Sequence, residues 1–189
     1  MHKCLPNFFT YLDKYENKIF QNNNTNIGII YRNYQSTNRE LELTKIAKAC
    51  KRKRYKLYVS NDLKLAMKVK ADGIYIPSFN KSKMFSNLEQ KKLLIIGSAH
   101  NQKEIKEKIR QQCQILFIAP VFYVKGKKTP LNTHKFNYLS HTNKIKFYAL
   151  GGINEKNLQK LKLLNIKGFA CVSMFKKKPA LKRPVFLKN

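Results

Sequence analysis

The chain has 189 residues, enough for one domain with a full core, and carries 39 Lys and Arg against 10 Asp and Glu, a net charge of +29. This charge favours anionic partners, but the lysines are spread along the whole chain, which argues against a dedicated nucleic-acid surface. Cys4, Cys50, Cys113 and Cys171 form no CxxC pair, and neither a signal-peptide core nor a bilayer-spanning apolar run of about 18 residues is present, so we expect a soluble, cytoplasmic protein with reduced thiols.

Short apolar runs alternate with segments of helical pattern along the chain, which predicts repeated strand–helix units and a parallel sheet. The strand-like runs lie at 7–12, 27–31, 55–60, 73–76, 93–97, 115–119, 145–150 and 168–172. Eight such strands are the number that closes a barrel of this type. The sequence therefore predicts one compact (β/α)8 TIM barrel over residues 1–175, followed by a basic tail at 176–189. The core candidates on these strands are Ile29, Val59, Ile74, Ile95, Phe117, Phe147 and Val172.

Three segments between the strands have a clear helical pattern. Residues 37–53 place apolar side chains near one face, and residues 101–112 and 154–164 each begin at an asparagine that can cap free N–H groups. The connection after Ile76 is short and rich in Ser and Lys, so a full helix there is not expected. The non-periodic segment 120–132 follows a strand, which places it on the face where such barrels build their sites.

A glycine pair closes the strand at 145–150 in the run Ala-Leu-Gly-Gly-Ile-Asn, residues 149–154. Gly151 and Gly152 have no Cβ, so the backbone can turn tightly and approach a ligand, and the N–H groups of a following helix can bind an anion. This pattern predicts a phosphate cradle. The alternative is an ordinary turn between a strand and a helix, and the pair alone does not decide between the two.

The carboxyl ends of parallel strands converge in a barrel, so the residues that follow each strand are the candidate site residues. They are Arg32, Asn61, Asp62, Ser78, Asn80, Ser98, His100, Lys125, Lys127, Lys128, Gly151, Gly152 and Ser173. A basic rim with one clear carboxylate suits phosphate or diphosphate binding, with a divalent cation as a further ligand. Asp62 has a second interpretation as a helix cap, and Arg32 as the partner of a neighbouring acid, whereas His100 is interpreted as structural.

Five motifs stand in an order and spacing that resemble a known family. They are Asn-Asp-Leu-Lys-Leu-Ala at 61–66, Ala-Asp-Gly-Ile-Tyr-Ile at 71–76, Ile-Gly-Ser-Ala-His-Asn at 96–101, Ala-Pro-Val-Phe at 119–122 and the glycine run at 149–154. In these motifs the chain resembles the thiamine-phosphate synthase/TenI superfamily over nearly its whole length. The resemblance implies a TIM barrel that joins a hydroxymethylpyrimidine diphosphate to a thiazole phosphate and releases pyrophosphate, with Mg²⁺ bound.

The resemblance also implies roles for single residues. It assigns Mg²⁺ to Asp62 with Asn61 beside it, and the catalytic positions to Arg32 and Lys127. The thiazole phosphate is assigned to Gly151, Gly152 and Ser173, and Asn61 and Ser98 are further substrate-binding candidates. The implied partners are phosphorylated pyrimidine and thiazole molecules, without nucleic acid or membrane, and a homo-oligomer is left open.

Several positions differ from the family pattern. Ile30 and Tyr34 stand in place of a glutamine and a lysine, Asn80 in place of the second magnesium carboxylate, and Val124 and Gly126 in place of two threonines. The histidine of the related thiazole tautomerases falls on Pro120. These differences motivate a second hypothesis, a phosphate-metabolite-binding or regulatory protein of the same fold. The net charge motivates a third, a basic RNA-associated protein.

Overall fold

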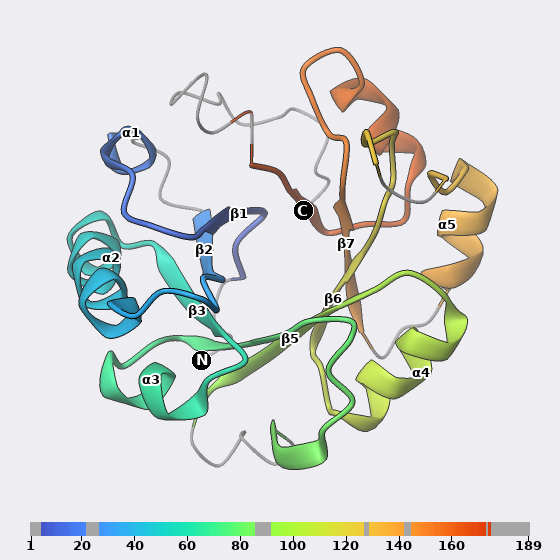
Figure 1. Cartoon of the computed structure of the whole chain (residues 1–189). Helices are drawn as coiled ribbons and strands as arrows, with labels where there is room; N and C mark the ends of the chain where they lie inside the picture. Colours follow the sequence, from blue (N-terminus) through green and yellow to red (C-terminus); the bar gives the residue numbers. More distant parts are fainter. Residues whose placement is uncertain are drawn as a thin grey trace.

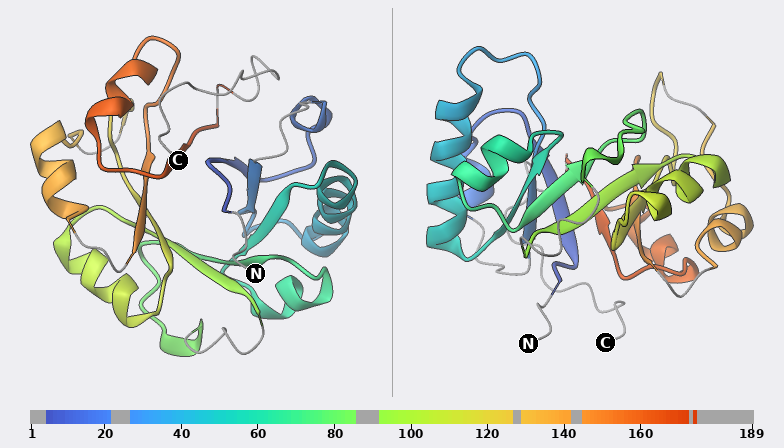
Figure 2. Two further views of the ribbon diagram at one scale, coloured as in Figure 1. Left: turned by 180° about the vertical axis from the view of Figure 1, so that it is seen from behind. Right: turned by 90° about the horizontal axis from the view of Figure 1, so that it is seen from below.

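Eight parallel strands close into a barrel in chain order, with the helices on its outside (Figure 1, Figure 2). The computed structural model describes residues 5–21, 27–85, 92–126, 129–141, 145–172 and 174. The strands are β1 Phe8–Leu12, β2 Ile27–Tyr31, β3 Lys56–Ser60, β4 Gly73–Ile76, β5 Leu94–Ala99, β6 Ile115–Ile118, β7 Lys146–Leu150 and β8 Gly168–Ala170. The predicted (β/α)8 barrel is confirmed.

The barrel closes where the first strand pairs with the last one. Phe8 lies opposite Phe169 and Phe9 opposite Ala170 in the parallel ladder between β1 and β8. Because all eight strands run in the same direction, their carboxyl ends form one rim. The segments that follow the strands therefore meet at this rim.

The helices between the strands are short, apart from the one after β2. They are α1 Asn17–Phe20, α2 Arg39–Lys53, α3 Leu63–Lys68, η1 Lys83–Phe85, α4 Gln102–Arg110, α5 Thr133–Leu139 and η3 Leu158–Leu163. Asn101 caps α4 as predicted, because its side chain accepts a hydrogen bond from the Glu104 N–H. None of the helices in the described part of the chain is long and apolar enough to cross a bilayer.

The prediction of a helix over 154–164 is wrong, since only the 3₁₀-helix Leu158–Leu163 forms in this segment. The asparagine at 154 builds a turn with Asn157 instead of capping a helix. Asn154 Oδ1 accepts hydrogen bonds from the N–H groups of Lys156 and Asn157, while Asn157 Oδ1 accepts one from the Asn154 N–H. Asparagine side chains that bind nearby backbone groups compete with helical hydrogen bonds, which explains the difference.

Side chains alternate along the strands between two separate cores. The core inside the barrel is mainly aromatic and contains Phe9, Tyr11, Ile30, Tyr58, Tyr75, Ile96, Ile115, Phe117, Tyr148 and Ala170. Of the predicted core residues, Phe117 lies in this inner core, whereas the other buried ones lie between the sheet and the helices: Ile29, Val59, Ile74, Ile95 and Phe147. Val172 is 39% exposed, so its assignment to the core is wrong. The last strand ends at Ala170, before it reaches Val172.

Glycines make room for the rings inside the barrel. A Cβ on Gly28 would lie 2.4 Å from the ring of Phe9, and one on Gly168 would lie 2.6 Å from the ring of Tyr148. Barrels of this type are more often filled by branched aliphatic side chains. Here large rings from some strands pack against glycines of neighbouring strands.

The three described cysteines are buried and free, in agreement with the expectation of reduced thiols. Burial raises the pKa of the Cys113 thiol to about 12 and also raises that of Cys50. Both thiols therefore stay protonated and unreactive at neutral pH. Cys4 lies outside the described residues.

Candidate functional site

Most of the predicted site residues meet at the rim formed by the carboxyl ends of the strands. Arg32 follows β2, Asn61 and Asp62 follow β3, Ser98 lies near the end of β5, and the glycine pair follows β7. Lys127 and Ser173 lie outside the described residues, as do Lys128 and the tail at 176–189.

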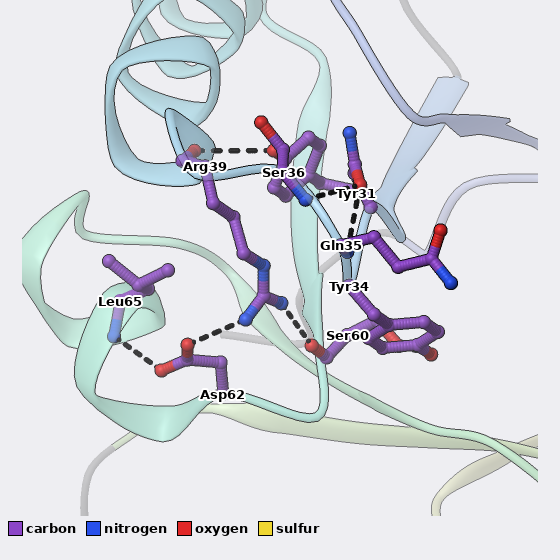
Figure 3. A network of polar contacts seen from close by, with 9 residues as sticks. Tyr31, Tyr34, Gln35, Ser36, Arg39, Ser60, Asp62 and Leu65 are labelled. Atoms are coloured by element: carbon purple, nitrogen blue, oxygen red, sulfur yellow. Dashed lines mark hydrogen bonds and ion pairs between the residues drawn. The ribbon is translucent and has the colours of Figure 1, made fainter.

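Asp62 is held by two different groups, one on each carboxylate oxygen (Figure 3). Its Oδ1 accepts a 2.9 Å hydrogen bond from the Leu65 N–H and thereby caps α3. Its Oδ2 accepts a 2.8 Å bond from Nη1 of Arg39. The interpretation of Asp62 as a helix cap is confirmed, and the carboxylate has an ion pair in addition.

Arg39 is a rim residue that the sequence reasoning missed. It stands at the first position of α2, and its side chain reaches across to the end of β3, where Nη2 donates a 2.7 Å hydrogen bond to the Ser60 carbonyl (Figure 3). A cation in the first turn of a helix opposes the helix dipole, so an arginine there needs a partner elsewhere. This unfavourable position is the feature of the sequence that could have indicated a distant partner for Arg39.

Asn61 and Asn80 bind one another across the ends of β3 and β4. The amide of Asn80 donates a hydrogen bond to Oδ1 of Asn61, whose backbone is left-handed with a φ of 59°. Asn80 is held from below, because its carbonyl accepts a 2.7 Å hydrogen bond from Nζ of Lys108 in α4. The two amides therefore form a neutral pair beside Asp62.

Lys108 is completely buried beneath the loop that carries Asn80. Its Nζ also donates 2.8 Å hydrogen bonds to the Pro77 carbonyl and to Oε1 of Gln111, so the ammonium has three acceptors. Burial lowers the pKa of Lys108 to about 8. The sequence analysis did not single out this lysine, and only its position opposite the loop after β4 distinguishes it from the other lysines of the chain.

A chain of hydroxyl groups leads from the barrel interior to Ser98. Tyr11 donates to the Tyr75 hydroxyl over 3.3 Å, and Tyr75 donates to Oγ of Ser98 over 2.9 Å. Burial raises the pKa of both tyrosines, so they remain neutral donors at physiological pH. Ser98 is itself buried, at the floor of the rim.

Arg32 lies above this floor. Its Cζ is 5.0 Å from the centre of the Tyr11 ring, a cation–π distance, and its Nε is 3.8 Å from a carboxylate oxygen of Asp13. The side chain of Arg32 is 46% exposed, so this ion pair is weak and the guanidinium is accessible at the mouth of the barrel. Both interpretations of Arg32, acid partner and site residue, agree with its position.

The glycine pair is required by the packing of a neighbouring loop. Gly151 and Gly152 have φ values of +96° and +70°, and the Phe122 N–H donates a 3.1 Å hydrogen bond to the Gly151 carbonyl. A Cβ on Gly152 would lie 2.6 Å from the Tyr123 carbonyl oxygen. The turn alone therefore demands glycine at this position, and a phosphate cradle is a further role that stays a prediction.

His100 is a structural residue, as predicted. Its Nδ1 lies 2.7 Å from the Ala119 carbonyl, and its backbone N–H donates to a carboxylate oxygen of Glu104. These contacts join the end of β5 to the end of β6 and to α4.

The donor set around Asp62 does not fit Mg²⁺. This ion requires nearly octahedral oxygen ligands, mainly carboxylates and waters. Both oxygens of Asp62 are engaged, Asn61 Oδ1 accepts the amide of Asn80, and the residues that the structure describes contain no group of three or more His, Cys, Asp or Glu suited to a metal.

The fold and the rim define a (β/α)8-barrel protein with an arginine-bearing site at the carboxyl ends of its strands. The sequence profile described as thiamine monophosphate synthase matches residues 22–175, and the chain belongs to this family. The thiamine-phosphate synthase of Prochlorococcus marinus subsp. pastoris is 32% identical over 135 residues, which are 70% of this chain and 38% of that protein.

Two further comparisons cover more of the related chains. The thiamine-phosphate synthase of Pediococcus pentosaceus is 27% identical over 175 residues, 87% of this chain and 80% of that protein. The solved thiamine phosphate pyrophosphorylase from Pyrococcus furiosus superposes with a TM-score of 0.75 over 93% of this chain and 89% of that chain, at 18% identity. At this identity the likeness supports the fold. The chain spans less than two fifths of the length of the Prochlorococcus relatives.

Proposed function

We propose that the chain is a transferase that joins a hydroxymethylpyrimidine diphosphate to a thiazole phosphate and releases pyrophosphate. One observation carries the proposal: the family positions Arg32, Asn61, Asp62, Gly151 and Gly152 all lie at a single rim of one closed barrel. Phosphorylated pyrimidine and thiazole molecules are the proposed ligands, and the cytoplasm is the proposed location.

The proposed reaction relies on positioning and on electrostatic stabilisation. The bond between the pyrimidine methylene and the diphosphate breaks, the electron pair leaves with pyrophosphate, and the thiazole captures the resulting pyrimidine cation. Arg32 lies at the mouth of the barrel, where its charge stabilises the leaving pyrophosphate. Ser98 lies at the floor of the rim, where its Oγ accepts a hydrogen bond from Tyr75, and its proposed role is to orient the pyrimidine ring of the substrate.

The thiazole phosphate is proposed to bind at the glycine turn. The backbone there is proposed to approach a phosphate closely, because neither Gly151 nor Gly152 carries a side chain of its own, and Ser173 is the further family position for this phosphate. Lys127 is proposed to act with Arg32 on the diphosphate.

The test is an assay of the purified full chain with both substrates, which follows thiamine phosphate and pyrophosphate together. We expect one pyrophosphate for each thiamine phosphate formed, and Arg32→Met should lower turnover strongly. Arg52→Met is the matched control because Arg52 is exposed in α2, away from the rim. Binding of thiazole phosphate without any product would overturn the proposal.

That same result would support a second candidate function, a phosphate-metabolite-binding or regulatory protein. The contacts of Asp62 with Arg39 and with the Leu65 N–H favour this candidate. They occupy both oxygens of the carboxylate that the family pattern assigns to magnesium.

A further inference from the structure

We propose that this chain binds its phosphorylated ligand without a divalent cation, with the Arg39–Asp62 pair standing where the family pattern places magnesium. The inference rests on the proposed function for the nature of the ligand. It is carried by the contacts of Asp62, Arg39, Asn61 and Asn80.

Asp62 cannot be released from Arg39 at low cost. The side chains of Arg39 and Asp62 are only 18% and 24% exposed, and Cζ of Arg39 lies at cation–π distance from two rings, 5.8 Å from the centre of Tyr31 and 5.9 Å from that of Tyr34. Within the described chain, Nε of Arg39 is buried without a hydrogen-bond partner. A cation bound to Asp62 would leave this partly buried guanidinium without its counter-ion, which is strongly unfavourable.

The neighbouring oxygen donor is engaged as well. Oδ1 of Asn61 accepts the amide of Asn80, which stands where the pattern has the second carboxylate. The loop of Asn80 cannot easily move away, because the Asn80 carbonyl accepts hydrogen bonds from Lys108 in α4 and from Gln111, which follows α4. The loop is therefore fixed with an amide, and not a carboxylate, toward the rim.

The charge balance of the rim is kept without an ion. A divalent cation with two carboxylates has no net charge, and neither does one guanidinium with one carboxylate. An anionic ligand therefore meets no uncompensated carboxylate at Asp62, and the accessible Arg32 provides the attraction. A phosphate or diphosphate needs no cation to approach this rim.

The first experiment measures inorganic pyrophosphate binding to the full chain by calorimetry, in EDTA and in Mg²⁺, with correction for magnesium bound by pyrophosphate in solution. We expect the two affinities to agree within about twofold. Binding that requires Mg²⁺, or no binding in either condition, would overturn the inference. Product formation is measured separately, so pyrophosphate binding without turnover refutes the proposed function and leaves this inference intact.

The second experiment uses Mn²⁺ alone as the probe, with free Mn²⁺ measured by electron paramagnetic resonance. We expect the wild-type chain to show no saturable site, and the double variant Arg39→Met, Asn80→Asp to acquire one. The matched control Arg52→Met, Asn80→Asp keeps the Arg39 pair and should not acquire the site. Saturable binding to the wild type that Asp62→Asn abolishes contradicts the inference, and this measurement does not depend on the folding of the double variant.

Discussion

Nζ of Lys108 lies 2.7 Å from the carbonyl oxygen of Asn80, so a completely buried ammonium of α4 holds the loop that follows β4. The contact crosses 28 residues of sequence and couples a helix on the outside of the barrel to the rim. It fixes the amide of Asn80 against Asn61 and makes Lys108 a positioning residue of the site.

Lys108→Met should lower the free energy of unfolding by about 1–3 kcal/mol, because the carbonyls of Pro77 and Asn80 lose a buried donor. Urea unfolding of the wild type and the variant measures the loss. Lys106→Met on the same helix, where the lysine is exposed, is the matched control and should change stability by less than about 0.5 kcal/mol. Equal losses in the two variants would contradict the role of Lys108.

The stability that depends on Lys108 should also vary with pH. Its pKa is about 8 in the folded chain against an ordinary value of 10.5, so between these values the unfolded chain binds more protons than the folded one. Stability from this group therefore rises with pH across the window, by at most about 1.4 kcal/mol per pH unit, and is constant below it. The difference in unfolding free energy between wild type and Lys108→Met, measured from pH 8 to pH 10, should show this rise. A difference that is flat or falls with pH would show that Lys108 stays charged.

Gly152→Ala should destabilise the chain more than Gly126→Ala. Both glycines have positive φ values near 70°, so both variants incur a backbone cost of about 1–2 kcal/mol. Only Gly152 adds a clash, since its Cβ would lie 2.6 Å from the Tyr123 carbonyl, whereas nothing lies within 4 Å of a Cβ on Gly126. Thermal unfolding of the two variants checks the difference, and similar losses would show that the loop around Tyr123 yields freely.

Phe147→Ala should cost about 3–5 kcal/mol, because the ring is 3% exposed between the sheet and the helices. Leu163→Ala is the control, since its side chain is 63% exposed and its loss should cost little. Denaturant unfolding compares the two. A loss below about 1 kcal/mol for Phe147→Ala would mean that this core is loosely packed.

Asp62→Asn separates the two contacts of this residue. The amide oxygen can still cap α3 through the Leu65 N–H, but the charge that balances Arg39 is removed. We expect a loss of about 1–3 kcal/mol in unfolding free energy. Asp62→Ala removes the cap as well and should lose about 1 kcal/mol more. If the two variants are equally stable, the cap contributes nothing.

The strands of this chain could be predicted because buried parallel strands read as continuous apolar runs, and eight runs with intervening helices are enough for a closed barrel. The rim residues followed from the same pattern, since the carboxyl ends of parallel strands must converge. Arg32, Asn61, Asp62, Ser98 and the glycine pair were found in this way.

The sequence did not show which side of the sheet each buried residue faces, and only the tertiary structure decided it. Phe117 and Phe147 stand in similar apolar runs, yet one ring lies inside the barrel and the other against the helices. A run that is apolar at every position carries no alternation from which the facing can be read, so the register of the closed sheet decides it.

The side-chain contacts between the rim residues also could not be predicted from the sequence. Arg39 reaches Asp62 across 23 residues, and the buried Lys108 reaches Asn80 across 28, each from a helix to a strand end in another repeat. Local patterns report on neighbours in the chain, such as the cap at Asn101, whereas ion pairs and buried donors depend on which surfaces the closed barrel brings together. The sequence by itself determined the barrel and its rim, and the packing of helices against strand ends decided which of the rim groups are already bound to one another.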